Sequence, residues 1–392
     1  MKVQTSLYER RDAFVAVAIL VLSAACVGTI PDPPPPIPNP QAALARDSSV
    51  DHDRGPFLTP PAKTLPDPIL DSRWARHPVI AERTDRWIDF WTGEGADDFA
   101  RYLVRMRRYS DLIDTEISAG KLPNSLRYLP IVESGYLPTA QSSAGATGLW
   151  QLMSGTAREI GLAVGPLIDE RRDPVVSTPK ALSILSSHHG RFKSWYLALA
   201  AYNAGPNRIS RLLRRHAALA TGGDSLYVVL HGLLPEETRD FIPKLLAASV
   251  LARSLERYGF ELRQVPSFSF EEVTVPDATS VDVIARAAEV PKDLIKALNP
   301  QLVRGFTPAN RETLIRVPPE HGVVFQTNYE LVPVDERVSF LEHKVAPGDT
   351  LGHIALRYGV PLGILRAANP GIEPRFLQTG QSLIVPRVLA AG

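Results

Sequence analysis

The spacing of apolar residues divides the chain into a helical part and a part that mixes strands with helices. Between about residues 69 and 262, apolar side chains recur at steps of three and four, as in DDFARYLVRMRRYSDLI and EETRDFIPKLLAASVLARSL. This is the period of one face of an α-helix, and no strand-like alternation of any length interrupts it. The sequence therefore predicts a mainly α domain over residues 69–262.

The C-terminal part contains one motif twice. Residues 273–300 align without a gap with residues 343–370, and both copies end in Asn-Pro. Each copy reads as strand, helix, helix, strand. An internal repeat of this kind indicates two copies of one small unit. We therefore predict two small α+β modules of βααβ order, over residues 268–318 and 341–387.

The first residues have the layout of an export signal. Three basic residues precede the apolar run FVAVAILVLSAA, and the one cysteine of the chain, Cys26, follows it. The run is too short to span a bilayer well, which predicts a signal peptide over residues 1–25. The small residues before Cys26 resemble a bacterial lipobox, whose cysteine becomes a lipidated N-terminus. The alternative is an ordinary exported protein with an incidental cysteine.

Two further features of this region bear on its location. Val27 and not Asp follows Cys26, and the rule for lipoproteins then favours the outer membrane, facing the periplasm. Residues 26–68 contain PDPPPPIPNP and read as a proline-rich linker. Proline lacks a backbone donor and fixes φ, so this linker predicts a polyproline spacer between an anchor and the helical domain.

Composition excludes several classes of partner. The net charge is +1, with 43 Lys and Arg against 42 Asp and Glu, so the chain lacks the strongly basic surface that nucleic acid demands. One cysteine allows no disulfide framework and no cysteine-rich zinc site. His188 and His189 are neighbours on a predicted helix and point about 100° apart, so they rarely share an ion. We expect no metal and no cofactor.

One carboxylate, Glu133, follows an apolar run in LPIVESGY. The segment SLRYLPIVES predicts a helix that places Glu133 near its C-terminal end. The helix dipole and the apolar neighbours both disfavour the ionised form there and would raise the pKa of Glu133, as a general acid requires. Taken alone, Glu133 reads more simply as a solvated glutamate at a helix end.

Three stretches after Glu133 change that interpretation. They are SSAGATGLWQLMSGTA, ALAAYNAGPNRI and LPEETRDFIPKL. Together with Glu133 they resemble the soluble lytic transglycosylase (SLT) domain, whose fold is lysozyme-like. The family's Glu-Ser, Gly-Leu-x-Gln and Ala-Tyr-Asn signatures stand here as Glu133-Ser134, Gly148-Leu149-Trp150-Gln151 and Ala201-Tyr202-Asn203.

The repeated modules carry a second resemblance. VAPGDTLGHIALRYGV, residues 345–360, resembles the Gly-Asp-Thr-Leu loop and the following helix of a LysM domain, a family that binds the N-acetylglucosamine portion of glycans. The earlier copy lacks this loop and is a degenerate LysM-like module. The order of all these parts resembles the membrane-bound lytic murein transglycosylases of the D type.

The resemblance implies a reaction on peptidoglycan glycan strands. The β-1,4 bond between N-acetylmuramic acid and N-acetylglucosamine is cleaved without water. Glu133 would protonate the leaving glycosidic oxygen, and then act as base towards the muramoyl 6-hydroxyl, which closes onto C1 as a 1,6-anhydro end. Ordinary glycosidases use two carboxylates; here the proximity of an internal hydroxyl replaces the second one.

The resemblance also implies a set of substrate-binding residues, which are Ser142, Gln151, Tyr202 and Asn203. The amides suit N-acetyl groups and sugar hydroxyls, and Tyr202 would orient Glu133, unless it is a core aromatic residue. Trp150 either stacks on sugar or belongs to the core. Phe241 departs from the tyrosine that many relatives carry, which removes a phenol from the catalytic neighbourhood.

Two charged segments have a structural interpretation. Residues 169–173, Asp-Glu-Arg-Arg-Asp, predict a solvated, self-paired turn before a helix. Asp349 is expected to cap its loop and helix. Two alternatives to a lytic transglycosylase remain: a goose-type lysozyme that hydrolyses the same bond, and a non-catalytic peptidoglycan-binding wall protein. Products that end in anhydromuramic acid distinguish a lytic transglycosylase from a goose-type lysozyme.

Overall fold

The structure is a computed structural model that describes most of the chain from residue 66 onwards. The described residues are 66–386 without 166, 218–222, 262, 309–310, 334–335, 338–339, 361 and 370. The expected signal peptide, Cys26 and nearly all of the linker therefore lie outside the described residues. Among the described residues, no helix has the length and apolar character needed to cross a membrane.

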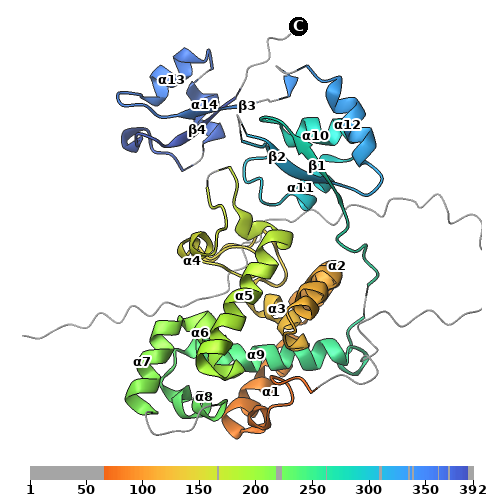
Figure 1. The fold of residues 1–392 in the computed structure, drawn as a ribbon, viewed down its shortest axis with the longest axis vertical. Helices are drawn as coiled ribbons and strands as arrows, with labels where there is room; N and C mark the ends of the chain where they lie inside the picture. The colour runs from red at the N-terminus through yellow and green to blue at the C-terminus, as the bar shows by residue number, and fades with distance from the viewer. Residues whose placement is uncertain are drawn as a thin grey trace, which may run out of the picture. The chain divides into compact units, whose positions relative to one another are not determined.

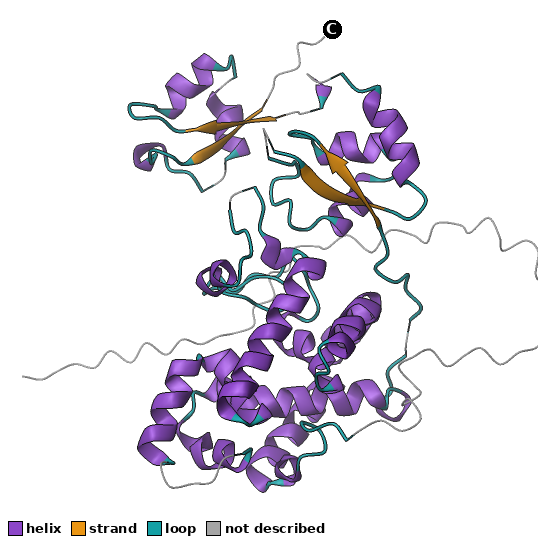
Figure 2. Ribbon diagram, in the orientation of Figure 1, coloured by secondary structure: helices purple, strands orange, loops and turns teal. Residues whose placement is uncertain are grey.

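The segment before residue 262 is helical (Figures 1 and 2). Its α-helices are α1 (Pro78–Thr92), α2 (Ala96–Ala119), α3 (Leu129–Ser134), α4 (Ser154–Glu159), α5 (Pro174–Phe192), α6 (Trp195–Ala204), α7 (Pro206–His216), α8 (Ser225–Leu230) and α9 (Glu236–Arg253). Its 3₁₀ turns are η1 (Arg73–Arg76), η2 (Asn124–Tyr128), η3 (Glu170–Arg172), η4 (His231–Leu233) and η5 (Glu256–Tyr258).

Local sequence explains where two of these helices begin. Asp173 caps α5 by accepting hydrogen bonds from the N–H groups of Val175 and Val176, with Pro174 at the first helical position. Ser194 caps α6 by accepting from Leu197. The helix expected over SLRYLPIVES is instead divided between η2 and α3. Pro130 is the reason, because it has no N–H to donate back into the preceding turn.

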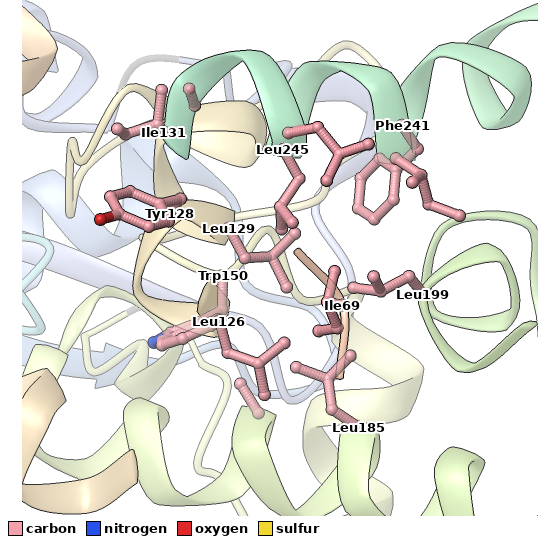
Figure 3. Packing of buried hydrophobic residues seen from close by; sticks show 14 of the residues in the cluster. Ile69, Leu126, Tyr128, Leu129, Ile131, Trp150, Leu185, Leu199, Phe241 and Leu245 are labelled. Atoms are coloured by element: carbon pink, nitrogen blue, oxygen red, sulfur yellow. The ribbon is translucent and has the colours of Figure 1, made fainter. Parts of the chain in front are cut away.

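One apolar core holds the helical domain together. Helix α9 packs against α1, α3 and α6, and α6 is buried along most of its length because it is apolar on all sides. Figure 3 shows Leu129 of α3, Leu185 of α5 and Leu245 of α9 converging on the same cluster as Trp150. The core therefore fixes α3, which carries Glu133, against α9.

The two repeated modules have the predicted βααβ order. The first consists of β1 (Glu271–Val275), α10 (Val281–Ala287), α11 (Lys292–Leu298) and β2 (Thr313–Val317). The second consists of β3 (Phe340–Lys344), α13 (Leu351–Arg357), α14 (Leu362–Ala368) and β4 (Ser382–Pro386), with the turn η7 (Pro374–Phe376) before β4. Each strand pair is antiparallel, and each module has its own apolar core. This confirms the expected fold class: a mainly α domain followed by two small α+β modules.

The repeated asparagine has the same structural task in both modules. The side chain of Asn299 donates to the carbonyl oxygen of Arg316 and accepts from its N–H, at 2.7 and 2.8 Å. Asn369 makes the same pair of hydrogen bonds with Ile384, at 2.6 and 2.8 Å. These bonds tie the end of the second helix to the last strand, and they make Arg316 and Ile384 equivalent positions.

The first module has an addition that the sequence pattern did not predict. Helix α12 (Gly322–Glu330) follows β2 and packs against α10 and β1. Phe325 and Tyr329 of α12 belong to the apolar core of this module. The module therefore extends past the end of the repeat.

Candidate active site

Glu133 lies in the last turn of α3, as the sequence predicts. The helix ends at Gly135, whose φ of 56° is left-handed. A Cβ atom at this position would lie 2.3 Å from Cε1 of Tyr102, so only glycine fits here. This tight turn ends α3 two residues after Glu133.

The surroundings of Glu133 favour its protonated form. The side chain is half-buried, and loss of solvent raises its pKa to about 8. The nearby carboxylate of Glu237 contributes to this raised pKa, whereas the ammonium of Lys244 opposes it. The shift has the direction expected from the sequence, with burial as its largest cause. At neutral pH Glu133 therefore holds a proton that it can donate.

The loop that contains Gly148 and Gln151 is held in an unusual backbone conformation. Gln151 has a φ of 46°, which is uncommon for a residue with a side chain. Gly148 has a φ of 90°, and a Cβ atom there would lie 1.8 Å from the carbonyl oxygen of Arg171. The amide of Gln151 donates to the carbonyl oxygens of Gly148 and Ala140, at 2.9 and 3.3 Å. Strained residues of this kind cluster at functional sites.

Two hydrogen bonds join the three sequence signatures. The hydroxyl of Ser134, next to Glu133, donates to the carbonyl oxygen of Leu149 at 2.9 Å. The hydroxyl of Tyr202 donates to the carbonyl oxygen of Trp150 at 2.7 Å. Helix α3, the loop and α6 are therefore fastened to one another at the residues that carry the signatures.

Tyr202 and Trp150 differ in detail from the expectations. Burial raises the pKa of Tyr202, and the charge of Glu133 raises it as well. The Tyr202 hydroxyl nevertheless bonds to the loop. Trp150 is fully buried, and its Nε1 donates to the hydroxyl of Thr178 at 3.0 Å. It is a core residue with no face free for a sugar.

Asn203 connects α6 to the start of α9. Its Nδ2 donates to Glu237 at 3.1 Å, and its Oδ1 accepts from the hydroxyl of Thr238 at 2.6 Å. Ser142 lies apart from this network, since it is exposed and its hydroxyl accepts from the N–H of Ala146. The loop that carries Gln151 is thus joined to α3, which carries Glu133, and to α6, which carries Tyr202 and Asn203, whereas Ser142 lies apart.

Two charged residues of the site were not predicted. Glu237 and Lys244 lie seven residues apart on α9, on one face of that helix, and both act on the pKa of Glu133. Lys244 is partly buried, its Nζ lies 4.3 Å from the centroid of the Trp87 ring, and burial lowers its pKa. Phe241, between them in sequence, is buried in the core. The seven-residue spacing of the two charged residues within EETRDFIPK could have indicated that they share one face of a helix.

The prediction that residues 169–173 are solvated is wrong. Asp169, Arg171 and Asp173 are all buried. The turn is self-paired as expected, because the guanidinium of Arg171 bonds to both carboxylate oxygens of Asp169, at 2.9 and 2.7 Å. It also donates to the carbonyl oxygens of Gly145 and Leu152, at 2.9 and 3.0 Å. The turn can be buried because its charges are paired inside the protein.

The remaining sequence predictions concern metals and the second module. No group of three His, Cys, Asp or Glu side chains within the described residues could hold a metal ion. His189 stacks on Trp195 instead, with ring centroids 4.2 Å apart. Asp349 accepts from the N–H of Ala346 and from His343, and so caps its loop as expected. The cap of α13, however, is Thr350.

Comparison with known proteins divides the chain in the same way as the structure does, into a helical domain and two small modules. Residues 113–222 match the transglycosylase SLT domain, residues 269–334 match the LysM-like domain of the lytic transglycosylase MltD, and residues 343–386 match the LysM domain. The chain therefore combines an SLT domain with a LysM-like and a LysM domain, which confirms the resemblance found in the sequence.

Individual relatives cover parts of the chain. Membrane-bound lytic murein transglycosylase D of Escherichia coli K12 is 29% identical over 294 residues, which are 72% of this chain and 64% of that protein. A putative tributyltin chloride resistance protein of an Alteromonas species is 36% identical over 111 residues, 28% of this chain and 54% of that one. The solved 70 kDa soluble lytic transglycosylase SLT70 of E. coli is 27% identical, covering 38% of this chain and 24% of that one, with a TM-score of 0.32. The chain thus spans less than two thirds of the length of each of these proteins.

Proposed function

We propose that this chain is a peptidoglycan lytic transglycosylase. It cleaves the β-1,4 bond between N-acetylmuramic acid and N-acetylglucosamine without water and leaves 1,6-anhydromuramoyl ends. One observation carries the proposal: a half-buried Glu133 with a pKa of about 8 lies beside the loop and helix of the other two SLT signatures, joined by hydrogen bonds. Mass spectrometry of the products released from purified sacculi tests it.

The carboxyl group of Glu133 serves both steps of this reaction. In the first step Glu133 donates its proton to the glycosidic oxygen, and the bond from that oxygen to C1 of the muramoyl sugar breaks. In the second step the carboxylate takes the proton of the 6-hydroxyl, and the oxygen atom of that hydroxyl bonds to C1. Glu133 ends protonated, as it began. The internal hydroxyl is already next to C1, so its proximity replaces an activated water.

The other site residues act by position and hydrogen bonding. Within the described residues, the side-chain oxygen of Gln151 accepts no hydrogen bond, so it is available to a sugar hydroxyl or an N-acetyl N–H. Both ends of the Asn203 amide are engaged, so Asn203 holds α6 to α9. Tyr202 holds the loop through Trp150. Ser142 lies on the exposed part of the loop, where it would meet the substrate at the edge of the site.

A second carboxylate near Glu133 supports one alternative. Glu237 is close enough to raise the pKa of Glu133, and hydrolysis by two carboxylates needs such a pair. A goose-type lysozyme reaction would then release reducing ends that carry an oxygen atom from water. Incubation in ¹⁸O-labelled water separates the two reactions, because transglycosylation incorporates no label. We favour transglycosylation because Glu237 is already the acceptor of the Asn203 amide.

The proposal extends to the rest of the chain. Residues 1–25 act as a signal peptide, 26–68 as a linker, 69–262 as the catalytic domain, and 268–318 and 341–387 as the two modules. The LysM domain holds the enzyme on glycan strands. Cys26 anchors the chain in the outer membrane, facing the periplasm. Labelling with a palmitate analogue should mark the wild type and not Cys26→Ser, and equal labelling of both would refute the anchor.

A further inference from the structure

A buried ion pair links the first LysM-like module to the helical domain. Nη1 of Arg316 on β2 lies 2.9 Å from both carboxylate oxygens of Asp173, the residue that caps α5. The two side chains are 6% and 4% exposed. Glu272 lies 3.5 Å from Nε of Arg316, and the ring of Phe270 covers the guanidinium. A buried pair with two bonds and shielding of this kind fixes geometry far better than an exposed pair does.

Backbone hydrogen bonds reinforce this link next to the ion pair. The N–H of Asp169 donates to the carbonyl oxygen of Gln301 at 3.0 Å, and the N–H of Val303 donates to that of Leu167 at 2.9 Å. Ile168 and Leu302 thereby form an antiparallel bridge. The module holds both ends of the buried turn, the ends at residues 167–169 and at Asp173.

The same turn holds the active-site loop from its other side. Arg171 donates to the carbonyl oxygens of Gly145 and Leu152, which flank Gly148 and Gln151 in sequence. The carbonyl oxygen of Arg171 lies where a Cβ atom of Gly148 would be. The contacts therefore run without interruption from the first module, through residues 167–173, to the loop that the Glu133 helix also binds.

The two modules differ in how exposed the loop is that corresponds to the Gly-Asp-Thr-Leu loop of a LysM domain. In the second module, Gly348 and Thr350 of this loop are exposed. In the first module, Thr279 and Ser280 at the end of the equivalent loop are 0% and 1% exposed, whereas Asp277 at its start is exposed. The hydroxyls of Thr279 and of Tyr329 on α12 are 2.7 Å apart. Helix α12 thus covers the end of the loop at Thr279.

The two modules also differ at the position that makes the ion pair. The asparagine bonds make Ile384 of the second module equivalent to Arg316. Isoleucine has no charge, so the second module has no residue at this position that could form an ion pair of the kind that Arg316 makes. The burial of the end of the loop and the residue at the ion-pair position therefore both indicate that the two modules have different roles.

We propose that the first LysM-like module is a brace for the active-site loop and not a glycan-binding module, with Arg316 as the positioning residue. The module presses the 167–173 turn against the loop and so keeps Gly148 to Gln151 in the conformation that catalysis needs. This inference rests on the proposed function for its effect on rate. Its effect on the order of the loop does not depend on what reaction occurs.

The test compares Arg316→Gln with Arg286→Gln in the full chain. Arg286 is an exposed residue on α10 of the same module and has no ion pair within the described residues. We expect Arg316→Gln to lower the rate at saturating sacculi at least fivefold and to speed amide hydrogen exchange over residues 144–152. Arg286→Gln should leave both unchanged. Arg316→Lys, which keeps the charge, should restore most of the rate.

Binding is measured separately, with Glu133→Gln added to each variant so that no substrate is consumed. We expect the same retention on sacculi with and without Arg316→Gln. Weakened retention at an unchanged rate would overturn the proposal and show a glycan-binding module. Unchanged exchange in the loop would overturn it as well.

Two further arms keep the outcome clear. If Arg316→Gln cannot be purified, Glu272→Gln removes only the weaker contact of Arg316 and should show the same pattern at smaller amplitude. If the wild type releases hydrolysed ends, the proposed function fails, while the exchange comparison still decides whether the module is a brace.

Discussion

The hydroxyl of Tyr202 lies 2.7 Å from the carbonyl oxygen of Trp150 and donates a hydrogen bond to it. The sequence signature predicts that Tyr202 orients Glu133. The tyrosine therefore acts on Glu133 through the loop, which the hydroxyl of Ser134 grips from the other side.

Tyr202→Phe tests this positioning role. The change leaves the Trp150 carbonyl oxygen without its partner, and we expect a loss of about 1–3 kcal/mol in the free energy of unfolding. The rate on sacculi should fall without a change in its pH dependence, because Glu133 keeps its proton. Urea unfolding and a pH–rate profile measure both. Tyr258→Phe is the control, because the Tyr258 hydroxyl makes no hydrogen bond to a described residue. A shifted pH profile in Tyr202→Phe would mean that the tyrosine acts directly on Glu133.

The left-handed backbone of Gln151 gives a second prediction. Gln151→Gly should relieve about 1 kcal/mol of backbone strain, but it also removes the two hydrogen bonds of the amide, so we expect little net change in stability and a loss of activity. Lys193→Gly is a matched control, since Lys193 is exposed and has a φ of 54° at the end of α5. Lys193→Gly should gain stability in thermal melts and keep its activity, whereas Gln151→Gly should lose activity. Full activity of Gln151→Gly would remove Gln151 from the site.

The charges on α9 predict opposite shifts of the pH profile. The first step needs protonated Glu133, so the rate should fall as pH rises through about 8. Glu237 raises this pKa, so Glu237→Gln should move the fall to lower pH. Lys244 lowers it, so Lys244→Met should move the fall to higher pH. Shifts of equal sign in the two variants would contradict the assigned surroundings of Glu133.

The raised pKa of Glu133 also determines how the stability of the protein changes with pH. Between the ordinary value of 4.5 and about 8, the unfolded chain ionises this group while the folded protein keeps it protonated. The contribution of Glu133 to stability is therefore full below pH 4.5 and is lost as pH rises to about 8. Glu133→Gln removes this loss. The melting temperature of the variant relative to the wild type should therefore rise across that window.

The second module gives a prediction about retention. Truncation after residue 335 removes the LysM domain and leaves the helical domain with its own core and its brace. We expect weaker retention on purified sacculi and unchanged melting of the helical domain. Asp349→Ala, which frees the N–H of Ala346 and the side chain of His343, should reproduce part of the loss. Equal retention of the truncated and full chains would show that the LysM domain is not the anchor to glycan.

The features that sequence could predict are those set by nearby residues. The helical period, the βααβ repeat and the place of Glu133 at a helix end all depend on short stretches of chain. The division of the expected helix at Pro130 was also a local effect, although its outcome was predicted incorrectly.

The features that sequence could not predict depend on distant partners. Asp173 is 143 residues from Arg316 in sequence, and this separation is why the 169–173 turn was expected in solvent. Likewise, Thr279 is buried by residues far from it in sequence, among them Tyr329 of α12 and Thr307. Charge pairs of this kind leave no period in the sequence, and only the folded chain brings them together.

The most direct test of the account is the release of anhydromuropeptides from sacculi by Glu133→Gln. The variant keeps the shape of the side chain and loses its proton. A general acid or base contributes about 10²–10⁴-fold, and one residue that serves both steps should cost at least the upper part of that range. Glu159→Gln, at the exposed end of α4, is the matched control and should keep full activity. Release near the wild-type rate by a folded Glu133→Gln protein would contradict the assignment of Glu133 and the proposed reaction with it.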